Sequence, residues 1–464
     1  MNVAAARRLL VLPRPTTWQL FVVLLVATLG SEYWDKDPVT FVAGLQLPWP
    51  RFMAVVLLLP LIVPPRDWRW SAVTRLPAHL RPMIVFWLAC AVSVVAIPFA
   101  PGRSTVGEFL KTFFHLSVYI VFVCVLVKWA TPQRVSLLVK VYYGLGAAAA
   151  VLSILQWVHG TLGLFEFLAP LRFQSGEYDV GVGLTTGFRA ASSFGEPSWA
   201  ARYYVHFIAL ALAFWFRTGA RRHLVVLVLC LVAFYAANSL LGYVIFVAFA
   251  IVGLLAQAWS RSTFSLSRRQ KIGLVATAAV CLLIWLSGAA PRLPDLMDRS
   301  VARVGLVLQG GGGAGNRIDS VFAGLEVWKL APILGVGLGN IDAYIVDFYL
   351  DPAWVLRSRF ASDSLYVQIL AETGIFGLTA FLWFWFRLLW FSAPGDYGSR
   401  PGVQGDLYTW MRFLQLDLFA QAVGMANASD YLNPHLWTVI AMVLACKTVL
   451  LAEGRTAALN EAVP

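Results

Sequence analysis

The chain has 464 residues, of which 59% are apolar without counting glycine, whereas soluble domains average roughly 45–50% with glycine included. Charged residues make up 13% of the chain, about half of the usual share. These proportions exclude a soluble fold, a disordered chain and a fibrous repeat. The net charge of +12 does not indicate a nucleic-acid partner, because the lysines and arginines stand in short clusters between apolar runs. We therefore expect an integral membrane protein.

A helix needs about 20 apolar residues to cross a bilayer. By this criterion the sequence predicts an all-α polytopic membrane protein, with residues 1–464 forming a single integral membrane domain of about twelve transmembrane helices. The predicted spans are 15–31, 42–64, 82–100, 113–130, 135–158, 198–216, 223–238, 240–259, 272–289, 364–391, 411–428 and 435–452. Pro48 and Pro50 interrupt the second span, and only Asn238-Ser239 separates the seventh from the eighth.

The short loops set the predicted orientation, because lysines and arginines concentrate in cytoplasmic loops. Basic clusters such as Arg66, Arg69, Arg75 and Arg81 recur in alternate loops, whereas residues 31–40 contain only Lys36 among three acidic residues. We therefore expect both termini on the cytoplasmic side.

Two long segments fall on the outer side in this topology, at 159–197 and 290–362. Both carry arginines, including Arg172 and Arg189 in the first and Arg317 in the second, and Arg202 follows just after the first. Two outer loops that fold over one another would present these guanidinium groups to an anion near the bilayer surface.

The stretch from Arg189 to Ser198 leads directly into the sixth span. Pro197 suits a first helical position, and Glu196 suits the positive end of a helix. One interpretation is a helix start with a capping carboxylate. The other places Arg189 and Glu196 at the membrane surface, within reach of a bound head group.

Two glycine-rich stretches follow in the second outer segment. Residues 310–315 lack the lysine and the hydroxyl of a nucleotide-binding loop, so we expect a flexible hinge there. After Arg317 an amphipathic stretch runs through Trp328, and Gly335-Val-Gly-Leu-Gly-Asn340 comes next. Glycines at this alternate spacing permit turns and close backbone approach.

Asp363 stands at the outer entrance of the tenth span. An aspartate there is ordinary as a helix N-cap, and the alternative is a functional carboxylate. Farther along this span, Gly374 and Gly377 predict close helix packing.

Four ionisable residues lie within predicted spans, where contact with lipid is costly. They are Lys140, Arg202, His206 and Asp417. We expect all four to face the bundle interior or a wet cavity. Structural pairing is favoured for Lys140 and Asp417, and a functional role for Arg202.

Taken in order, these motifs resemble the O-antigen ligase and O-antigen polymerase superfamily of bacterial inner-membrane proteins. The shared elements are Arg317, the Gly335–Asn340 turn and the segment Asp363-Ser-Leu-Tyr-Val-Gln-Ile-Leu-Ala-Glu-Thr-Gly-Ile-Phe-Gly377. The resemblance implies a GT-C-like, inverting, metal-independent glycosyltransferase without a cofactor. Its donor would be a polyprenyl-pyrophosphate-linked glycan.

Two departures from the ligase pattern favour a polymerase. Asp363 stands where ligases have a general-base histidine, and Ser239-Leu-Leu-Gly242 lacks the arginine that ligases often carry. On the resemblance, Asp363 is the expected general base, and Glu196 orients an arginine or contacts acceptor hydroxyls. Four arginines are expected to bind the pyrophosphate: Arg189 and Arg317, with Arg202 and Arg172 in support.

Two other functions stay open. A ligase would transfer the finished glycan to lipid A-core or to protein. An anion transporter would instead bind its solute near the midplane on broken helices. For a polymerase, the expected partners are the lipid-linked oligosaccharide and membrane lipid, and a chain-length regulator and a flippase are further candidates.

Overall fold

A computed structural model describes residues 40–42, 45–47, 77–100, 102–162, 190, 192, 197–237, 239–259, 312–348, 362–390, 402–428 and 432–461. The prediction of an all-α membrane protein is confirmed, apart from one short antiparallel hairpin of β1 (Thr40–Val42) and β2 (Leu45–Leu47). The helices are η3 (Ala78–Leu80), α4 (Arg81–Val92), η4 (Ser93–Phe99), α5 (Val106–Lys128), α6 (Pro132–Leu162), α7 (Pro197–Thr218), α8 (Arg221–Ala237), α9 (Leu240–Trp259), α12 (Gly312–Leu330), α13 (Asp342–Ile345), η6 (Val346–Phe348), α15 (Leu365–Leu389), α16 (Val403–Gly424), η7 (Met425–Asn427) and α17 (Pro434–Glu461).

The predicted spans coincide with helices wherever the structure describes them, except at one site. In the part of the chain that the structure describes, six helices are long and apolar enough to cross a membrane: Ala78–Phe99, Val106–Lys128, Pro132–His159, Pro197–Thr218, Leu365–Leu389 and His435–Gly454. Three more predicted spans coincide with α8, α9 and α16, and the break at Asn238-Ser239 does separate α8 from α9. The spans at 15–31 and 272–289 lie outside the described residues. The start of the span at 42–64 is wrong, because β1 and β2 occupy it just before Pro48.

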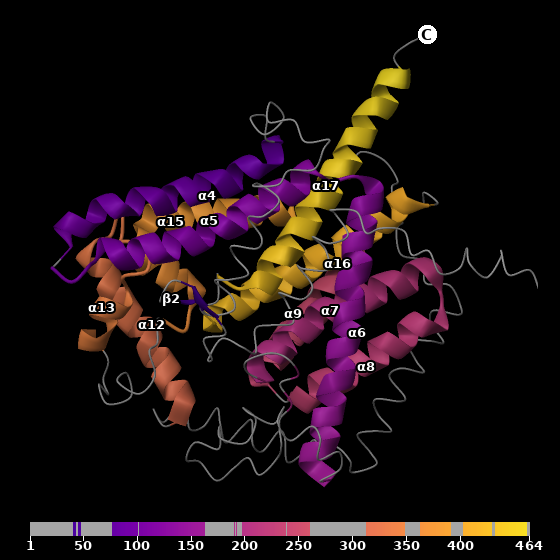
Figure 1. Ribbon diagram of the computed structural model, residues 1–464, viewed down its shortest axis with the longest axis horizontal. Coiled ribbons are helices and arrows are strands. Elements are labelled where there is room, and N and C mark those ends of the chain that lie inside the picture. The colour runs from indigo at the N-terminus through magenta and orange to yellow at the C-terminus, as the bar shows by residue number, and fades with distance from the viewer. Residues whose placement is uncertain are drawn as a thin grey trace, which may run out of the picture.

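The helices form two groups (Figure 1). In one group α4 and α5 run side by side with α15 packed on α4, and in the other α7 pairs with α8 while α6 crosses them steeply. Helices α16 and α17 join the groups, because α16 contacts α7 and α9 while α17 contacts α5. One apolar core extends through both groups, and a smaller core lies under α12 and α13.

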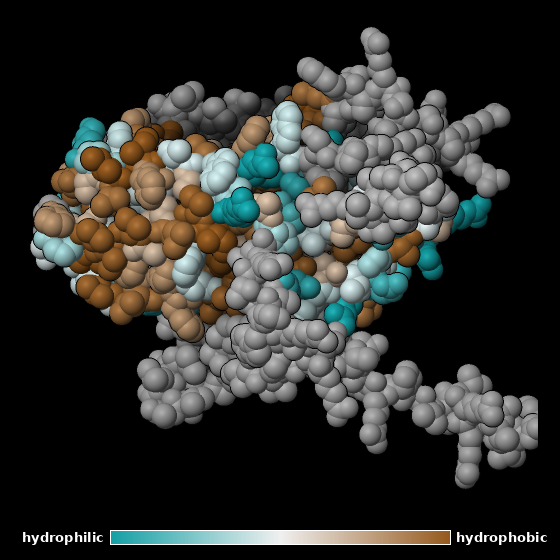
Figure 2. All heavy atoms as spheres, turned by 90° about the horizontal axis from the view of Figure 1, so that it is seen from above, coloured by the Kyte–Doolittle hydropathy of each residue, from teal (hydrophilic) through white to brown (hydrophobic). Residues whose placement is uncertain are grey.

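Burial differs between central and peripheral helices. The apolar windows of α7 and α17 are 83% buried, whereas those of α4 with η4 and of α5 are 44% and 50% buried. Figure 2 shows apolar side chains spread over one exposed face, and the exposed large side chains include Val95, Phe99 and Trp383. Apolar residues on the outside as well as the inside of a helix are typical of a membrane span.

Several backbone contacts join the helix ends that the alternating topology places on one side. The Ala190 N–H donates to the Ala236 carbonyl at the end of α8 (3.0 Å), and the Leu365 N–H donates to the Ala428 carbonyl beyond α16 (3.2 Å). Ala190 belongs to the first long segment, and Leu365 directly follows the second. Ala190 is therefore attached at the end of α8, and the start of α15 is attached just beyond the end of α16.

The intramembrane ionisable residues follow the prediction only in part. Asp417 pairs with His206 Nδ1 in the core, where the two side chains are 0% and 2% exposed, so the expected structural pairing of Asp417 is confirmed. Lys140 is exposed, so a position in the bundle interior is wrong, and a position in a wet cavity stays a prediction. It lies eight residues after the start of α6, about 12 Å along the axis, and a lysine can extend its ammonium group from there toward the membrane boundary.

Candidate active site

The site is built around the turn that carries Gly335, Gly337 and Gly339. All three have positive φ, of 71°, 95° and 78°, which residues with a Cβ adopt only at a cost. Space is also restricted, because a Cβ at Gly335 would lie 2.3 Å from the Glu372 carbonyl carbon. The glycines therefore allow the turn to lie directly against the backbone of α15.

Helix α15 is broken where the turn contacts it. Gly374 has φ 66° and ψ −171°, which is not helical. A straight helix would separate Tyr366 from Phe381 by about 22 Å along its axis, yet their ring centroids are 6.2 Å apart. The chain therefore bends sharply at Gly374. The close packing predicted at this glycine is present, because a Cβ there would lie 2.1 Å from the Ile333 carbonyl oxygen, but the partner is the segment that follows α12 and not a helix.

The glycine turn supplies hydrogen bonds that the broken helix cannot make internally. Four backbone bonds join them: Val336 N–H to Ala371 O (2.9 Å), Gly337 N–H to Glu372 O (3.0 Å), Ile375 N–H to Pro332 O (3.0 Å) and Phe376 N–H to Ile333 O (3.4 Å). The N–H groups of Gly335 and Asn340 also donate to backbone carbonyls. These donors are committed within the protein, so they do not form a phosphate cradle.

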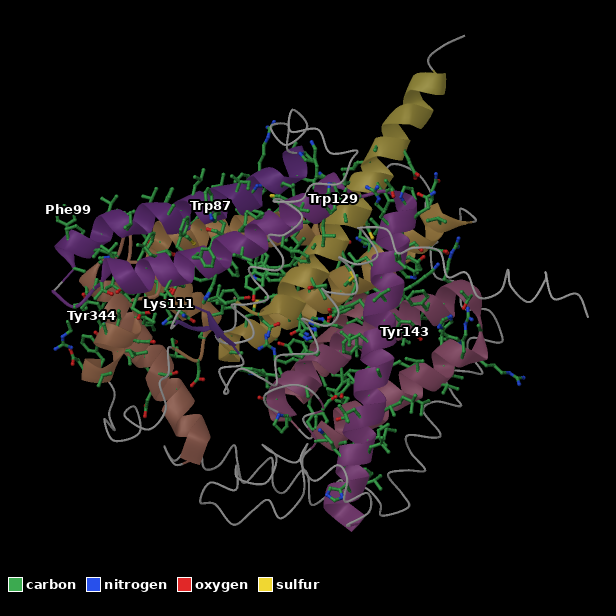
Figure 3. All side chains as sticks on the ribbon, viewed as in Figure 1. Trp87, Phe99, Lys111, Trp129, Tyr143 and Tyr344 are labelled. Atoms are coloured by element: carbon green, nitrogen blue, oxygen red, sulfur yellow. The ribbon has the colours of Figure 1, made fainter. Side chains whose placement is uncertain are left out.

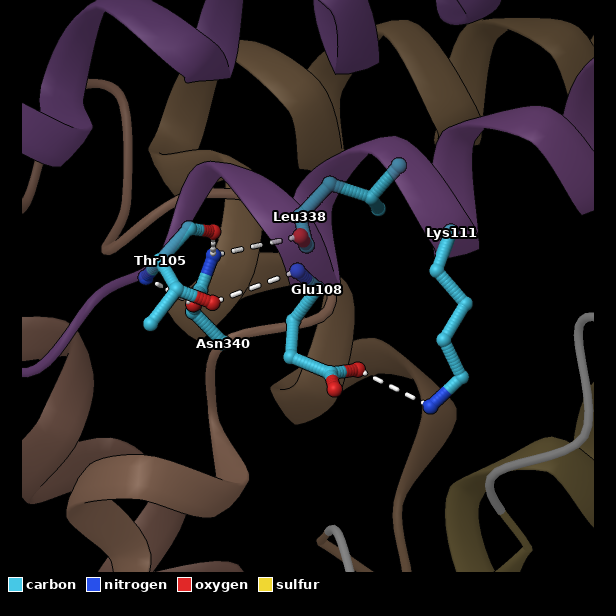
Figure 4. Close-up of polar contacts among 5 residues, drawn as sticks. All are labelled: Thr105, Glu108, Lys111, Leu338 and Asn340. Carbon is cyan, nitrogen blue, oxygen red and sulfur yellow. Dashed lines mark hydrogen bonds and ion pairs between the residues drawn. The ribbon is translucent and has the colours of Figure 1, made fainter.

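The loop between α4 and α5 holds the other side of the turn. Asn340 Oδ1 accepts the Thr105 N–H (2.7 Å), and Asn340 Nδ2 donates to the carbonyls of Thr105 (3.3 Å) and Leu338 (3.4 Å), as Figure 4 shows. Ser104 Oγ donates to the Val336 carbonyl (2.6 Å). The turn is thus fixed between this loop and the break in α15.

Tyr344 adds a further contact at this end of the molecule. Its hydroxyl accepts the Ser104 N–H (2.9 Å), and its side chain is buried. Figure 3 shows Tyr344 near Phe99, at the end of the α4–α5 pair opposite Trp129. An exposed ion pair between Arg103 and Asp347 lies beside it.

Asp363 is bound to α12 and does not cap α15. Ser320 Oγ donates to Asp363 Oδ2 (3.2 Å) and accepts the Asp363 N–H (3.0 Å). The N-cap of α15 is Ser364, which makes no side-chain capping bond, so the N-cap interpretation of Asp363 is wrong. Arg317 precedes Ser320 by one turn of α12, so its backbone is near Asp363, while its side chain lies outside the described atoms.

Helix α16 connects the backbone of Arg202 to the start of α15. It is buried in α7 at 3% exposure, and Gln421 Nε2 donates to its carbonyl (3.1 Å). One residue later in α16, the Ala422 carbonyl accepts the hydroxyl of Tyr366 (2.6 Å), which lies in the first turn of α15. The end of α16 therefore contacts both the α7 backbone at Arg202 and the helix that follows Asp363.

Three predicted site residues, Arg172, Arg189 and Glu196, lie outside the described residues. Helix α7 begins at Pro197, as the sequence predicts.

The residue that follows Arg189 is anchored at Ala236, and two positions later Ser192 has φ 55°. The Gln156 amide accepts the Ser192 N–H (2.7 Å) and donates to the Ser192 carbonyl (3.0 Å). Sequence reasoning missed this attachment, because a glutamine in an apolar helix does not reveal its partner.

Two further polar groups were missed. Glu372 is 1% exposed, and its carboxylate accepts a hydrogen bond from Gln368 Nε2 (3.1 Å). Ser320 is completely buried although it stands on an amphipathic helix. A glutamate inside an apolar span was a signal for the first, and nothing in the sequence singled out Ser320.

Comparison with known families agrees with this arrangement. Residues 225–382 match the family model described as O-antigen ligase, and the match includes α12, the glycine turn, Asp363 and the break in α15. Over these residues the chain is similar to the O-antigen ligase family. No curated protein sequence matches the chain.

The O-antigen ligase match confirms the resemblance inferred from the motifs. It supports a multi-pass membrane protein of the O-antigen ligase or polymerase type, a glycosyltransferase-like enzyme of polysaccharide biosynthesis with a lipid-linked glycan substrate.

Proposed function

We propose that the protein is a polysaccharide polymerase of the O-antigen or exopolysaccharide type. It transfers a glycan from a polyprenyl-pyrophosphate carrier to a lipid-linked repeat unit, with inversion and without a metal ion. The observation that carries this proposal is Asp363, which Ser320 holds on α12 one turn from Arg317. The family match over 225–382 supports the same chemistry.

In the proposed reaction Asp363 accepts the proton of the acceptor hydroxyl. The acceptor oxygen then attacks the anomeric carbon, the bond from that carbon to the pyrophosphate oxygen breaks, and the pyrophosphate carrier leaves with the bonding electrons. Arg189 and Arg317 bind the departing pyrophosphate, because guanidinium groups match phosphate oxygens in a bidentate manner. Arg202 and Arg172 add positive charge, and Glu196 orients an arginine or contacts the acceptor.

The proposed location is a bacterial inner membrane, with both termini in the cytoplasm and the site on the periplasmic side. The basic clusters of the alternate short loops support this orientation. A flippase that delivers the donor and a chain-length regulator are the proposed protein partners.

The test is glycan transfer by the purified full-length protein in proteoliposomes, with a polyprenyl-pyrophosphate-linked oligosaccharide and a chelator. We expect elongation of the glycan and an inverted anomeric configuration at the new linkage. Asp363→Asn should abolish elongation without affecting membrane insertion, whereas Asp342→Asn, a change to another carboxylate of the second outer segment, should leave it intact. Full activity of Asp363→Asn would remove the base assignment.

Two further measurements test how the pyrophosphate leaving group is bound and which acceptor is used. Arg317→Lys keeps the charge but loses the bidentate geometry, so we expect weakened donor use, and an unimpaired variant would contradict the pyrophosphate role. Addition of lipid A-core should leave the products of a polymerase unchanged. Transfer of the glycan to that lipid would identify a ligase.

A further inference from the structure

A single buried hydroxyl contacts Asp363 at two points. Ser320 Oγ accepts the backbone N–H of Asp363 at 3.0 Å and donates to its Oδ2 at 3.2 Å, while Ser320 itself is 0% exposed. Contacts to both the backbone and the carboxylate of one residue fix the direction of its side chain. They also engage the carboxylate through Oδ2.

The contact face of α12 makes the position of Ser320 rigid. Gly324 lies four residues after Ser320 and thus on the same face. A Cβ at Gly324 would lie 2.6 Å from Val367 Cγ1 and 3.3 Å from Ser362 Cβ. Helix α12 therefore lies unusually close to the segment around Asp363, and Ser362 at this contact is fully buried.

We propose that Ser320 is a positioning residue for the base Asp363, which fixes the direction of the Asp363 carboxylate and sets its basicity. This inference rests on the proposed function. A hydrogen bond donated to the charged form of a carboxylate stabilises that form. Loss of the Ser320 hydroxyl therefore makes Asp363 more basic but leaves it poorly directed.

The described elements that pack at this contact carry charged groups on α12, α13, η6 and α15, and those of α13 and η6 are Asp342 and Asp347. On α12, Arg317 lies one turn before Ser320 and Asp319 lies next to it; on α15 the next charged residue after Asp363 is Glu372. The end of α16 and η7, which contact Leu365 and Tyr366, carry no charged residue between 418 and 428. A change in pH dependence on mutation of Ser320 is therefore assigned to its own hydroxyl, since the change leaves these charges in place.

The experiment measures the pH–rate profile of glycan transfer for the full-length protein in proteoliposomes, with the same oligosaccharide donor. In Ser320→Ala we expect kcat to fall at least tenfold, KM for the donor to stay unchanged, and the acid limb to move up by roughly one pH unit, as expected for a carboxylate that loses one charge-assisted hydrogen bond. Ser320→Thr keeps a hydroxyl and should restore the wild-type acid limb. Ser117→Ala, which removes a partly buried hydroxyl on α5, should leave the acid limb unchanged.

The outcomes separate this inference from the proposed function. If Asp363→Asn is inactive but Ser320→Ala has the wild-type kcat and acid limb, the positioning role is overturned and the base assignment stands. If Asp363→Asn is fully active, the base assignment itself is overturned. If Ser320→Ala does not fold, Ser320→Cys replaces it: a thiol is a weak donor, so an acid limb shifted in the same direction supports the role and an unshifted one overturns it.

Discussion

Gly374→Ala should be far more destabilising than an ordinary glycine substitution. Its backbone, with φ 66° and ψ −171°, is in a region that is essentially restricted to glycine and costs other residues about 1–3 kcal/mol. In addition, the new Cβ would lie 2.1 Å from the Ile333 carbonyl oxygen, whereas ordinary contacts begin at 3.4 Å. The glycine turn must therefore withdraw by more than an ångström.

This withdrawal breaks the four backbone hydrogen bonds between the turn and α15. At about 1 kcal/mol net for each bond, the additional loss is about 4 kcal/mol. Gly402→Ala is the matched control, because Gly402 has φ 80° and ψ −162° but no atom within 4 Å of the added Cβ. Gly402→Ala should lose only the stability that the strained backbone conformation costs, about 1–3 kcal/mol.

The assay is unfolding of the purified proteins by titration with SDS in mixed micelles. We expect the free energy of unfolding of Gly374→Ala to fall about 4 kcal/mol below that of Gly402→Ala. Equal stability of the two variants would refute the reasoning that the turn is held against the break in α15.

Two other predictions use the same titration. His206→Leu removes the imidazole partner of the buried Asp417 carboxylate, which keeps its hydrogen bond from Gln421, and this loss should cost about 3–5 kcal/mol. The double variant with Asp417→Leu should recover most of this loss, and simple additivity would contradict the pairing. The pKa of Asp342 is raised above 3.8, chiefly by desolvation and then by Glu108, with Lys111 opposing. Its contribution to stability is therefore fully present below pH 3.8 and is lost as the pH rises through the raised value. The stability of Asp342→Asn relative to the wild type should therefore be higher at pH 7 than at pH 3. A stability difference that does not change with pH would contradict the raised pKa.

The helical architecture was predictable because membrane spans are encoded locally. Length and hydropathy located the spans now seen as α5, α6, α7 and α17, and Pro197 correctly marked the start of α7. The local sequence signals gave wrong predictions where tertiary contacts determine the backbone conformation. Glycines disfavour helices, yet α12 begins at Gly312, inside the stretch predicted to be a hinge.

The candidate site was predictable in its residue types and not in its contacts. The motifs indicated Asp363 and the glycine turn, but the Ser320–Asp363 bond joins residues 43 positions apart, and no periodicity encodes such a pair. The break at Gly374 was equally hidden, because a glycine in an apolar run has the same sequence appearance whether it packs against a helix or ends one. The contact of Gly374 with Ile333, which is visible only in the folded structure, distinguishes these two possibilities.

The α4–α5 loop gives the surrounding lipid a mechanical connection to the candidate site. Residues 104 and 105 hold the glycine turn, and the apolar windows of the helices on either side of them are only 44% and 50% buried. Tilting of this helical pair in a thicker or thinner bilayer acts on the glycine turn and, through the bonds of that turn to α15, on the helix that begins just after Asp363. In the proposed reaction the rate of glycan transfer therefore depends on bilayer thickness.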